Sequence, residues 1–210
     1  MFMGGVKMSI NLRKGQKIDL TKGGGNGLKR IMVGLGWDEA APQGFLSSLF
    51  TQQEDIDCDA SVILCGENGK LIPGNELKDF TVFYNNLNYG NAIVHQGDNR
   101  TGAGDGDDEQ IMVDLSRIPS NIAKLVFVVN IYEADKKKQH FGMIKNAFIR
   151  LVDMASCQEF CKFNLSENYN GMTGLVVGEI YRRNGEWKFN AIGQPVKEAS
   201  NIIDMLRLYA

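Results

Sequence analysis

The sequence is short of the features that mark several protein classes. Its longest apolar run, Leu125 to Val129, is far below the ~20 residues of a membrane-spanning helix. The first residues contain no apolar segment of the signal-peptide type. We therefore expect a cytoplasmic protein with no transmembrane segment, in which residues 1–8 form an N-terminal extension. A net charge of −2 leaves no basic excess, so nucleic-acid binding is not expected.

Cysteine and histidine are also scarce. The four cysteines fit neither a zinc ribbon nor a small disulfide scaffold; they are Cys58, Cys65, Cys157 and Cys161. We interpret the last two as buried thiols, with a metal or redox role as the alternative. The only histidines, His95 and His140, lie in no zinc-ligand spacing. No Ser–His–Asp arrangement or activated cysteine emerges, so the sequence favours a protein that is not an enzyme.

What the chain does contain is a series of short segments rich in β-branched and aromatic residues, each bounded by Gly, Asn, Asp or Pro. With 43% hydrophobic residues, the 210 residues are enough for one packed domain over 1–210. The pattern predicts an all-β fold, an antiparallel β-sandwich. The expected strands are Met32–Leu35, Ser61–Cys65, Thr81–Tyr84, Ile111–Leu115, Leu125–Tyr132, Ala147–Val152, Lys162–Leu165, Leu175–Arg182 and Trp187–Ala191.

Turns and helices complete this prediction. Asn184-Gly185 predicts a tight hairpin, and a second hairpin is expected where Cys65 leads to Leu71. One or two short helices are expected. The first is C-terminal, with an apolar stripe from Val196 to Leu206 that docks on the sandwich or binds a partner. The second covers residues 139–145, and residues 39–54 are predicted to form a surface loop.

The most informative segment runs from His95 to Glu109. It combines five acidic side chains with glycines that let the backbone coil tightly. Two carboxylates ~5 Å apart repel by roughly 3 kcal/mol at an effective dielectric constant of ~20, and a hard cation removes that penalty. Calcium prefers about six to eight oxygen ligands from carboxylates, amides and backbone carbonyls, all of which this segment offers. The spacing is not that of an EF-hand.

A second acidic pair, Asp57 and Asp59, precedes or enters an expected strand. Period-two spacing directs both side chains to one face, where they could close the same cation site from a neighbouring loop. The alternative interpretation is a solvated acidic edge that deters aggregation between strands.

Several motifs together closely resemble the TerD family of tellurium-resistance and general stress proteins. The resemblance covers most of the chain. Its motifs are Gly97–Glu109, followed by Ile111–Leu115 and Ile118-Pro119, together with Leu12–Gly15, Gly34–Asp38, Asp57–Ser61, Asn146–Asp153, Gly178–Arg182, Gly185–Phe189 and Gly193-Gln194. The resemblance implies a calcium-binding β-sandwich with metal sites in acidic loops. It also implies a cytoplasmic stress protein that works with other tellurite-resistance proteins, some of them near the membrane.

The sequence and the resemblance lead to one functional prediction with two alternatives. We expect a non-enzymatic calcium-binding protein whose folding and partner interactions depend on the ion, with two adjacent ions favoured over one. The alternatives are a metal-dependent phosphoester hydrolase and a protein that binds a phospholipid or nucleotide through calcium. The predicted ligands are Asp57, Asp59, Asp98, Asn99, Gly102 (through its carbonyl), Asp105, Asp107, Asp108 and Glu109.

Overall fold

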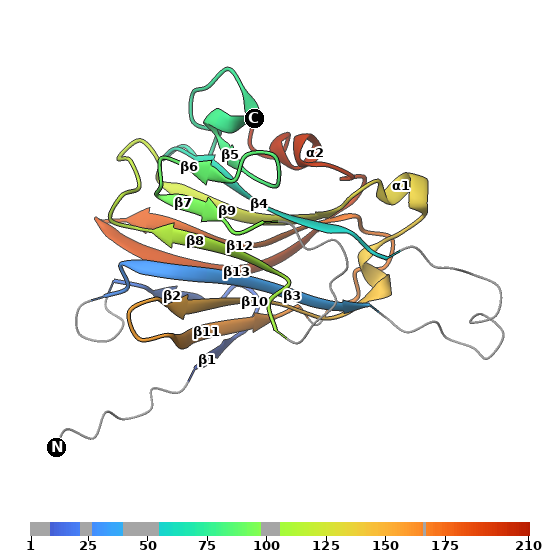
Figure 1. Cartoon of the computed structure of the whole chain (residues 1–210), viewed down its shortest axis with the longest axis horizontal. Helices are drawn as coiled ribbons and strands as arrows, with labels where there is room; N and C mark the ends of the chain where they lie inside the picture. Colours follow the sequence, from blue (N-terminus) through green and yellow to red (C-terminus); the bar gives the residue numbers. More distant parts are fainter. Residues whose placement is uncertain (1–8, 22–26, 40–54, 98–105, 166) are drawn as a thin grey trace.

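Two β-sheets packed face to face form the body of the computed structural model (Figure 1). The structure describes residues 9–21, 27–39, 55–97, 106–165 and 167–210. The seven-stranded sheet has the order β1 (Ile10–Leu12), β11 (Gln158–Asn164), β10 (Ile144–Asp153), β3 (Arg30–Glu39), β8 (Glu109–Asp114), β7 (Ile93–His95), β6 (Asn88–Tyr89). The six-stranded sheet has the order β2 (Lys17–Asp19), β13 (Glu186–Val196), β12 (Gly174–Arg183), β9 (Lys124–Ile131), β4 (Cys58–Cys65), β5 (Thr81–Val82).

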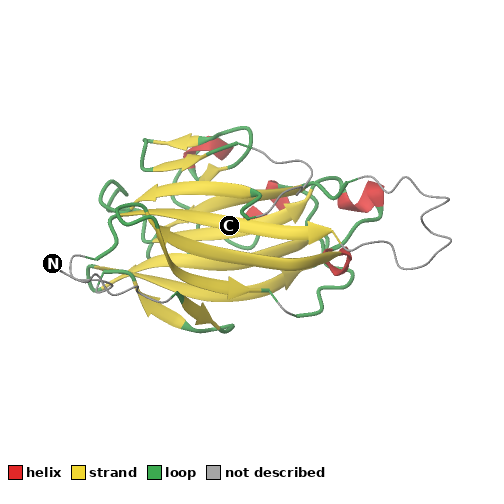
Figure 2. Cartoon of the chain, turned by 60° about the horizontal axis from the view of Figure 1, so that its bottom comes forward, coloured by secondary structure: helices red, strands yellow, loops and turns green. Residues whose placement is uncertain are grey.

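The predicted antiparallel sandwich is confirmed, with one parallel pair. Among the strands that the structure describes, every pair is antiparallel except β1 with β11, which run parallel at the edge of the seven-stranded sheet. Figure 2 shows the strands as the bulk of the molecule, with the short helices at its margins. The chain passes repeatedly between the two sheets, so strands far apart in sequence become neighbours. This crossing brings the start of β4, which contains Asp59, close to the start of β8, which contains Glu109.

Alternation along β4 shows how the sequence builds the core. Every residue of this strand is buried. Cys58, Ala60, Val62 and Leu64 join the main core between the sheets. Ile63 and Cys65, on the other face, join a second cluster under the C-terminal helix α2 (Ile202–Leu206). Burying one such aliphatic side chain contributes about 1.5–3 kcal/mol, so both faces of β4 hold it in place.

The expected strands all correspond to observed ones, although most extend further. The prediction missed β1, β2, β6 and β7, each of which has three residues or fewer. Both hairpins are confirmed. Cys65 pairs with Leu71 across the first turn, and β12 and β13 flank Asn184-Gly185. The strands are longer than predicted because hydrogen bonds to neighbouring strands extend them, and residue preferences alone do not predict those bonds.

The two predicted helices differ from the observed ones in position. The C-terminal helix exists, but it begins at Ile202 and not near Val196. Residues 195 and 196 instead continue β13, because Pro195 and Val196 pair with Leu175 and Gly174. The helix expected over residues 139–145 is wrong: only a 3₁₀ turn, Phe141–Met143, forms there. A four-residue helix that was not predicted, α1 (Ala134–Lys137), precedes it.

Some predicted segments fall outside the part of the chain that the structure describes. These are residues 1–8 and nearly all of the predicted surface loop, residues 40–54; Glu39 itself ends β3. Within the described residues, no helix has both the length and the apolar character needed to cross a membrane.

The Asn184-Gly185 turn provides a test of the fold. Both residues have positive φ, 54° and 76°, as a type I′ hairpin requires. A side chain in this region costs roughly 1–2 kcal/mol, so Gly185→Ala is expected to lower the free energy of unfolding by about that amount. Asn184→Gly, the control, should leave it nearly unchanged. Urea unfolding followed by circular dichroism measures both, and a Gly185→Ala midpoint equal to wild type would contradict the turn assignment.

Candidate metal centre

Five of the nine predicted metal ligands lie in the described part of the chain. Asp57 and Asp59 stand at the start of β4, and Asp107, Asp108 and Glu109 lead into or begin β8. The other four, Asp98, Asn99, Gly102 and Asp105, lie outside the described residues. The two described groups come from different sheets.

Asp59 is a buried carboxylate on the outer face of the six-stranded sheet. Its neighbours Cys58 and Ala60 point into the core, so strand alternation directs Asp59 away from it. Only 6% of Asp59 is exposed. Its Oδ2 accepts a hydrogen bond of 3.3 Å from Nδ2 of Asn130. Asn130 lies in β9, directly opposite Asp59 in the strand pairing. The Oδ1 atom of Asn130 is buried and makes no hydrogen bond with any described residue.

Glu109 joins the two sheets at the edge of the sandwich. Its side chain is buried, and Oε2 accepts a hydrogen bond of 2.7 Å from the backbone N–H of Ala60. This N–H lies beyond the end of β5, which pairs with β4 only at Val62 and Ile63. A carboxylate from β8 therefore takes the place that a neighbouring strand would otherwise fill, and it satisfies a buried donor that would be costly to leave unpaired.

His95 completes this contact. The backbone N–H of Gly97 donates to Nδ1 of His95, at 3.1 Å, so the ring proton resides on Nε2. Nε2 lies 3.1 Å from the carbonyl oxygen of Ala60 and 3.4 Å from Oε2 of Glu109. His95 and Glu109 thus bind both backbone groups of Ala60. The hydrogen bonds give the histidine a structural role.

Asp108 extends the pairing of β8 with β3. Its backbone N–H donates to the carbonyl of Leu35, and its Oδ2 accepts a hydrogen bond of 2.7 Å from the N–H of Trp37. Burial raises the pKa of the Asp108 carboxyl, the Trp37 hydrogen bond lowers it, and the charges of Asp38 and Asp107 raise it further. Negative charge is therefore concentrated at this end of β8.

Asp107 has a different environment. It forms a two-point ion pair with Arg150 of β10: Oδ1 lies 2.7 Å from Nε, and Oδ2 lies 2.9 Å from Nη2. Gln110 donates a third hydrogen bond, of 3.2 Å, to Oδ2. The Asp107 side chain is fully buried by these partners. Arg150 and Asn130 are site residues that sequence analysis missed, because nothing local in the sequence links them to the acidic segments.

Cys58 has a buried thiol whose pKa is raised by burial and by several carboxylates near it. Burial is the largest cause of its raised pKa, and four negative charges add to the effect, those of Glu109, Asp59, Asp57 and Asp108. We call these four residues the acidic cluster. The thiol stays protonated at neutral pH, so it offers no thiolate to a soft metal. Oxygen atoms are the available donors, and they suit a hard cation.

The acidic cluster is not a complete metal site by itself. Among the described residues, no group of three or more His, Cys, Asp and Glu side chains is arranged to hold a metal ion. The geometry gives one reason: Asp59 lies on the outer face of β4, whereas Glu109 binds the edge of β4 from the core side. Further oxygen ligands are needed to bridge them.

Of the two cysteines predicted as buried thiols, Cys157 and Cys161, the structure buries only the second. All four cysteines of the chain are unbridged, and Cys157 is exposed in the turn between β10 and β11, so its predicted burial is wrong. Cys161 is buried, and burial raises the pKa of its thiol to about 12. Burial likewise raises the pKa of Cys65 to about 11. These shifts keep both buried thiols in the unreactive, protonated form.

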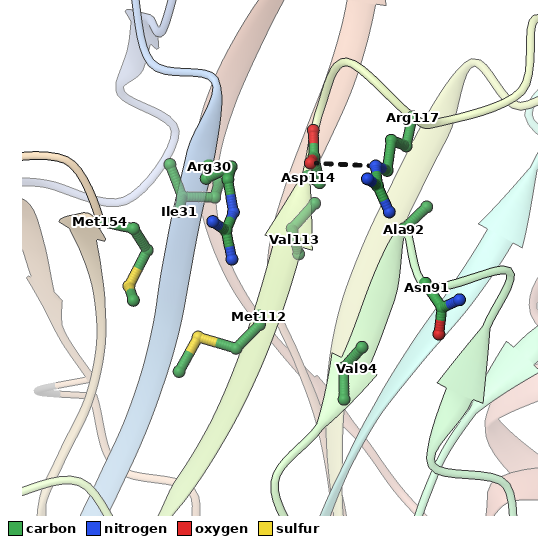
Figure 3. Close-up of a pocket in the computed structure, with 10 residues that line it drawn as sticks. All are labelled: Arg30, Ile31, Asn91, Ala92, Val94, Met112, Val113, Asp114, Arg117 and Met154. Atoms are coloured by element: carbon green, nitrogen blue, oxygen red, sulfur yellow. Dashed lines mark ion pairs between the residues drawn. The ribbon is translucent and has the colours of Figure 1, made fainter.

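A separate groove of about 340 Å³ crosses the outer face of the seven-stranded sheet (Figure 3). Met112 and Val94 lie along it, with Arg30 on one side and the ion pair of Asp114 and Arg117, 3.5 Å apart, on the other. No described residue of the acidic cluster lines this groove. The groove and the acidic cluster are therefore distinct features of the molecule.

Comparison with known proteins gives these features a family context. A family model described as TerD domain matches residues 8–207. Stress response protein SCP2 of Bacillus subtilis (strain 168) is 50% identical over 204 residues, which cover 96% of this chain and 100% of that protein. Tellurium resistance protein TerD of Serratia marcescens is 43% identical over 188 residues, which cover 89% of this chain and 91% of that protein.

A solved structure supports the fold. The crystal structure of a homologue of telluride resistance protein (TerD) from Streptomyces coelicolor A3(2) matches with a TM-score of 0.63 at 19% identity. The match covers 85% of this chain and 96% of that one. At this identity the comparison concerns the architecture alone.

The contact between Glu109 and Ala60 yields a stability prediction. Glu109→Ala removes the acceptor of a buried N–H, and the expected loss in the free energy of unfolding is about 2–3 kcal/mol. Glu109→Gln keeps an acceptor oxygen of the same reach, so its loss should be smaller. Urea unfolding in a chelating buffer measures both without interference from cations. Equal stability of wild type and Glu109→Ala would show that this contact does not hold the sandwich edge.

Proposed function

Because this chain belongs to the TerD family, we propose that it is a calcium-binding, non-enzymatic stress-response protein of the tellurium-resistance type. In this proposal the ion sits at the acidic cluster and stabilises the edge of the sandwich. The surface completed by the ion then serves contacts with other stress or tellurite-resistance proteins in the cytoplasm, some of them near the membrane. The names of the relatives support the stress and resistance role, and none of those quoted describes an enzyme.

One observation carries the calcium proposal: four carboxylates, drawn from both sheets, lie near enough to the buried thiol of Cys58 for their charges to act on it. Asp57 and Asp59 belong to the β4 end of the six-stranded sheet, and Asp108 and Glu109 to the β8 end of the seven-stranded sheet. All four raise the pKa of Cys58. Asp59 and Glu109 are buried, and Asp57 and Asp108 are partly buried. Like charges repel more strongly there than in water, so a divalent cation at this place would reduce the repulsion and join the sheets.

The chemistry of the donor set fits calcium. The described donors are carboxylate oxygens together with the buried Oδ1 of Asn130, which has no hydrogen-bond partner among the described residues. Calcium binds such neutral and charged oxygens in flexible geometry, whereas magnesium demands a stricter octahedron. The sequence predicts further ligands at Asp98, Asn99, Gly102 and Asp105, which would complete the coordination. Many carboxylates in one place favour two ions over one.

The surroundings of His95 support a binding role over hydrolysis. The hydrolase alternative needs a group that moves protons at the metal, and His95 is the imidazole nearest to the acidic segment in sequence. Both of its ring nitrogens already lie within hydrogen-bond distance of protein atoms, and only 2% of the residue is exposed. A histidine held in this way acts as a structural support.

Calcium binding is testable on the purified chain. Calorimetric titration should show saturable binding of about two calcium ions and weaker binding of magnesium. At free calcium 100-fold above the dissociation constant, the folded state should gain about 2.7 kcal/mol for one site. The melting temperature should therefore rise with calcium and fall with a chelator. A titration without heat of binding, together with a melting curve unaffected by calcium, would contradict the proposal.

The calcium affinities of two matched variants test whether the ion binds at the acidic cluster. Asp59→Asn keeps the size of a buried side chain and removes one charge from the acidic cluster, so calcium affinity should drop at least tenfold. Glu67→Gln makes the same chemical change in the exposed turn at the far end of β4, and its affinity should equal that of wild type. An equal loss in both variants would indicate a general effect of net charge and not a site at the acidic cluster.

A further inference from the structure

The sequence predicts Asp107 as a metal ligand, yet the structure gives it another partner. We propose that Asp107 is an anchor, and that Arg150 is a positioning residue which, through Asp107, holds Asp108 and Glu109 in place at the acidic cluster. This inference rests on the proposed calcium function. It deepens that function by separating the carboxylates that bind the ion from the one that sets their geometry.

The first argument is that both carboxylate oxygens of Asp107 are already engaged by protein donors. Both carboxylate oxygens are used in the two-point pairing with Arg150, at 2.7 and 2.9 Å, and one also accepts from Gln110. Two-point pairing of this kind fixes direction as well as distance. The side chain is fully buried. A metal ion at Asp107 would have to compete with the positive charge of the Arg150 guanidinium, which already binds both oxygens.

The second argument concerns the row of residues beneath Asp107. Strand register places Arg150 of β10, Gly34 of β3 and Gln110 of β8 side by side. The central position has no side chain, and a Cβ at Gly34 would overlap the carboxylate of Asp107. The glycine therefore provides the space in which Asp107 lies between its two partners. Gly36 is restricted in a similar way, because its Cβ would lie 2.5 Å from the carbonyl oxygen of Gly106.

The third argument links the anchor to the acidic cluster. Residues 107 and 108 are neighbours, and Asp108 pairs with β3 through Leu35 and Trp37 immediately beside the anchored residue. Glu109 follows and reaches Ala60 of the other sheet. Holding Asp107 on the outer face therefore fixes the start of β8. Asp108, bonded to Trp37 of β3, and Glu109, bonded to Ala60 of β4, then need no ordering when the ion binds, which favours affinity.

The anchor hypothesis and the ligand hypothesis predict opposite effects of one substitution. If Asp107 is the anchor, Arg150→Gln releases the start of β8, and calcium binding weakens. If Asp107 is a ligand, Arg150 competes with the ion, and its replacement leaves affinity unchanged or raises it. Arg150→Lys keeps the charge but loses the two-point geometry, so the anchor hypothesis expects an affinity between those of wild type and Arg150→Gln.

Calorimetric calcium titration of the full chain decides between them. We expect Arg150→Gln and Asp107→Asn each to weaken binding about tenfold, which corresponds to 1.4 kcal/mol. The double variant should be no weaker than either single one, because each already removes the same ion pair. Arg117→Gln, in the turn after β8 where Arg117 pairs with Asp114 (Figure 3), is the control and should bind as wild type does. Unchanged or tighter binding by Arg150→Gln overturns the proposal.

A second measurement needs no calcium and separates this inference from the proposed function. In a chelating buffer, amide hydrogen exchange of Trp37 and Ala60 reports whether Asp108 and Glu109 hold their positions. The anchor predicts at least tenfold faster exchange at both amides in Arg150→Gln. The exchange rate of the Leu64 amide should not change, because Leu64 lies further along β4 and its N–H donates to the carbonyl of Phe80. If the wild-type chain binds no calcium, the proposed function is contradicted and the anchor hypothesis is not. If exchange at Trp37 and Ala60 is the same in Arg150→Gln as in wild type, the anchor hypothesis is contradicted.

Discussion

A carboxylate taken out of water needs a donor or a cation, and this requirement governs one whole edge of the molecule. An isolated buried charge costs several kcal/mol even after the protein relaxes. Asp59, Asp107 and Glu109 are all removed from solvent here. Each must be compensated within the sandwich. The manner in which each is compensated divides the acidic segment into parts with different roles.

Glu109 and Asp107 are compensated by the protein itself, in opposite directions. Glu109 turns inward and binds the backbone of Ala60 together with His95, which closes the sandwich where β5 ends. Asp107 turns to the outer face and pairs with Arg150. Residues 107–109 thus make two attachments. Asp107 binds β10 on the outer face of the seven-stranded sheet, and Glu109 binds β4 of the other sheet. Asp108 lies between these two attachments in the sequence, and its charge acts on the thiol of Cys58 together with those of Asp57 and Asp59; these are the carboxylates for which we propose a cation.

How much of this could be predicted depends on the range of the interactions. Strand identity follows from local β-branched and aromatic runs, and the Asn184-Gly185 turn from two adjacent residues, so both were accessible from sequence. The helix predicted from Val196 failed because Pro195 and Val196 pair with β12, a tertiary contact that overrides helical periodicity. The placement of Asp57 and Asp59 at the entrance of β4 was also predictable, because the expected strand Ser61–Cys65 follows them closely.

The partners of the acidic residues were not predictable in the same way. Ala60 is separated from Glu109 by 49 positions, and Asp107 from Arg150 by 43. Only the strand order β10-β3-β8 brings the second pair together, and only Gly34, which lacks a side chain, leaves room for it. The sequence therefore predicted an acidic segment suited to a cation, but the roles of its individual carboxylates depend on the register of the sheets.

The most direct test is a crystal structure of the full chain grown with calcium, with the ions located by their anomalous scattering. The account predicts calcium bound by oxygens of the acidic cluster, drawn from both β4 and the start of β8, while Asp107 keeps its pairing with Arg150. Calcium bound elsewhere, or an acidic cluster surrounded only by water at saturating calcium, would contradict the claim that these carboxylates form a cation site.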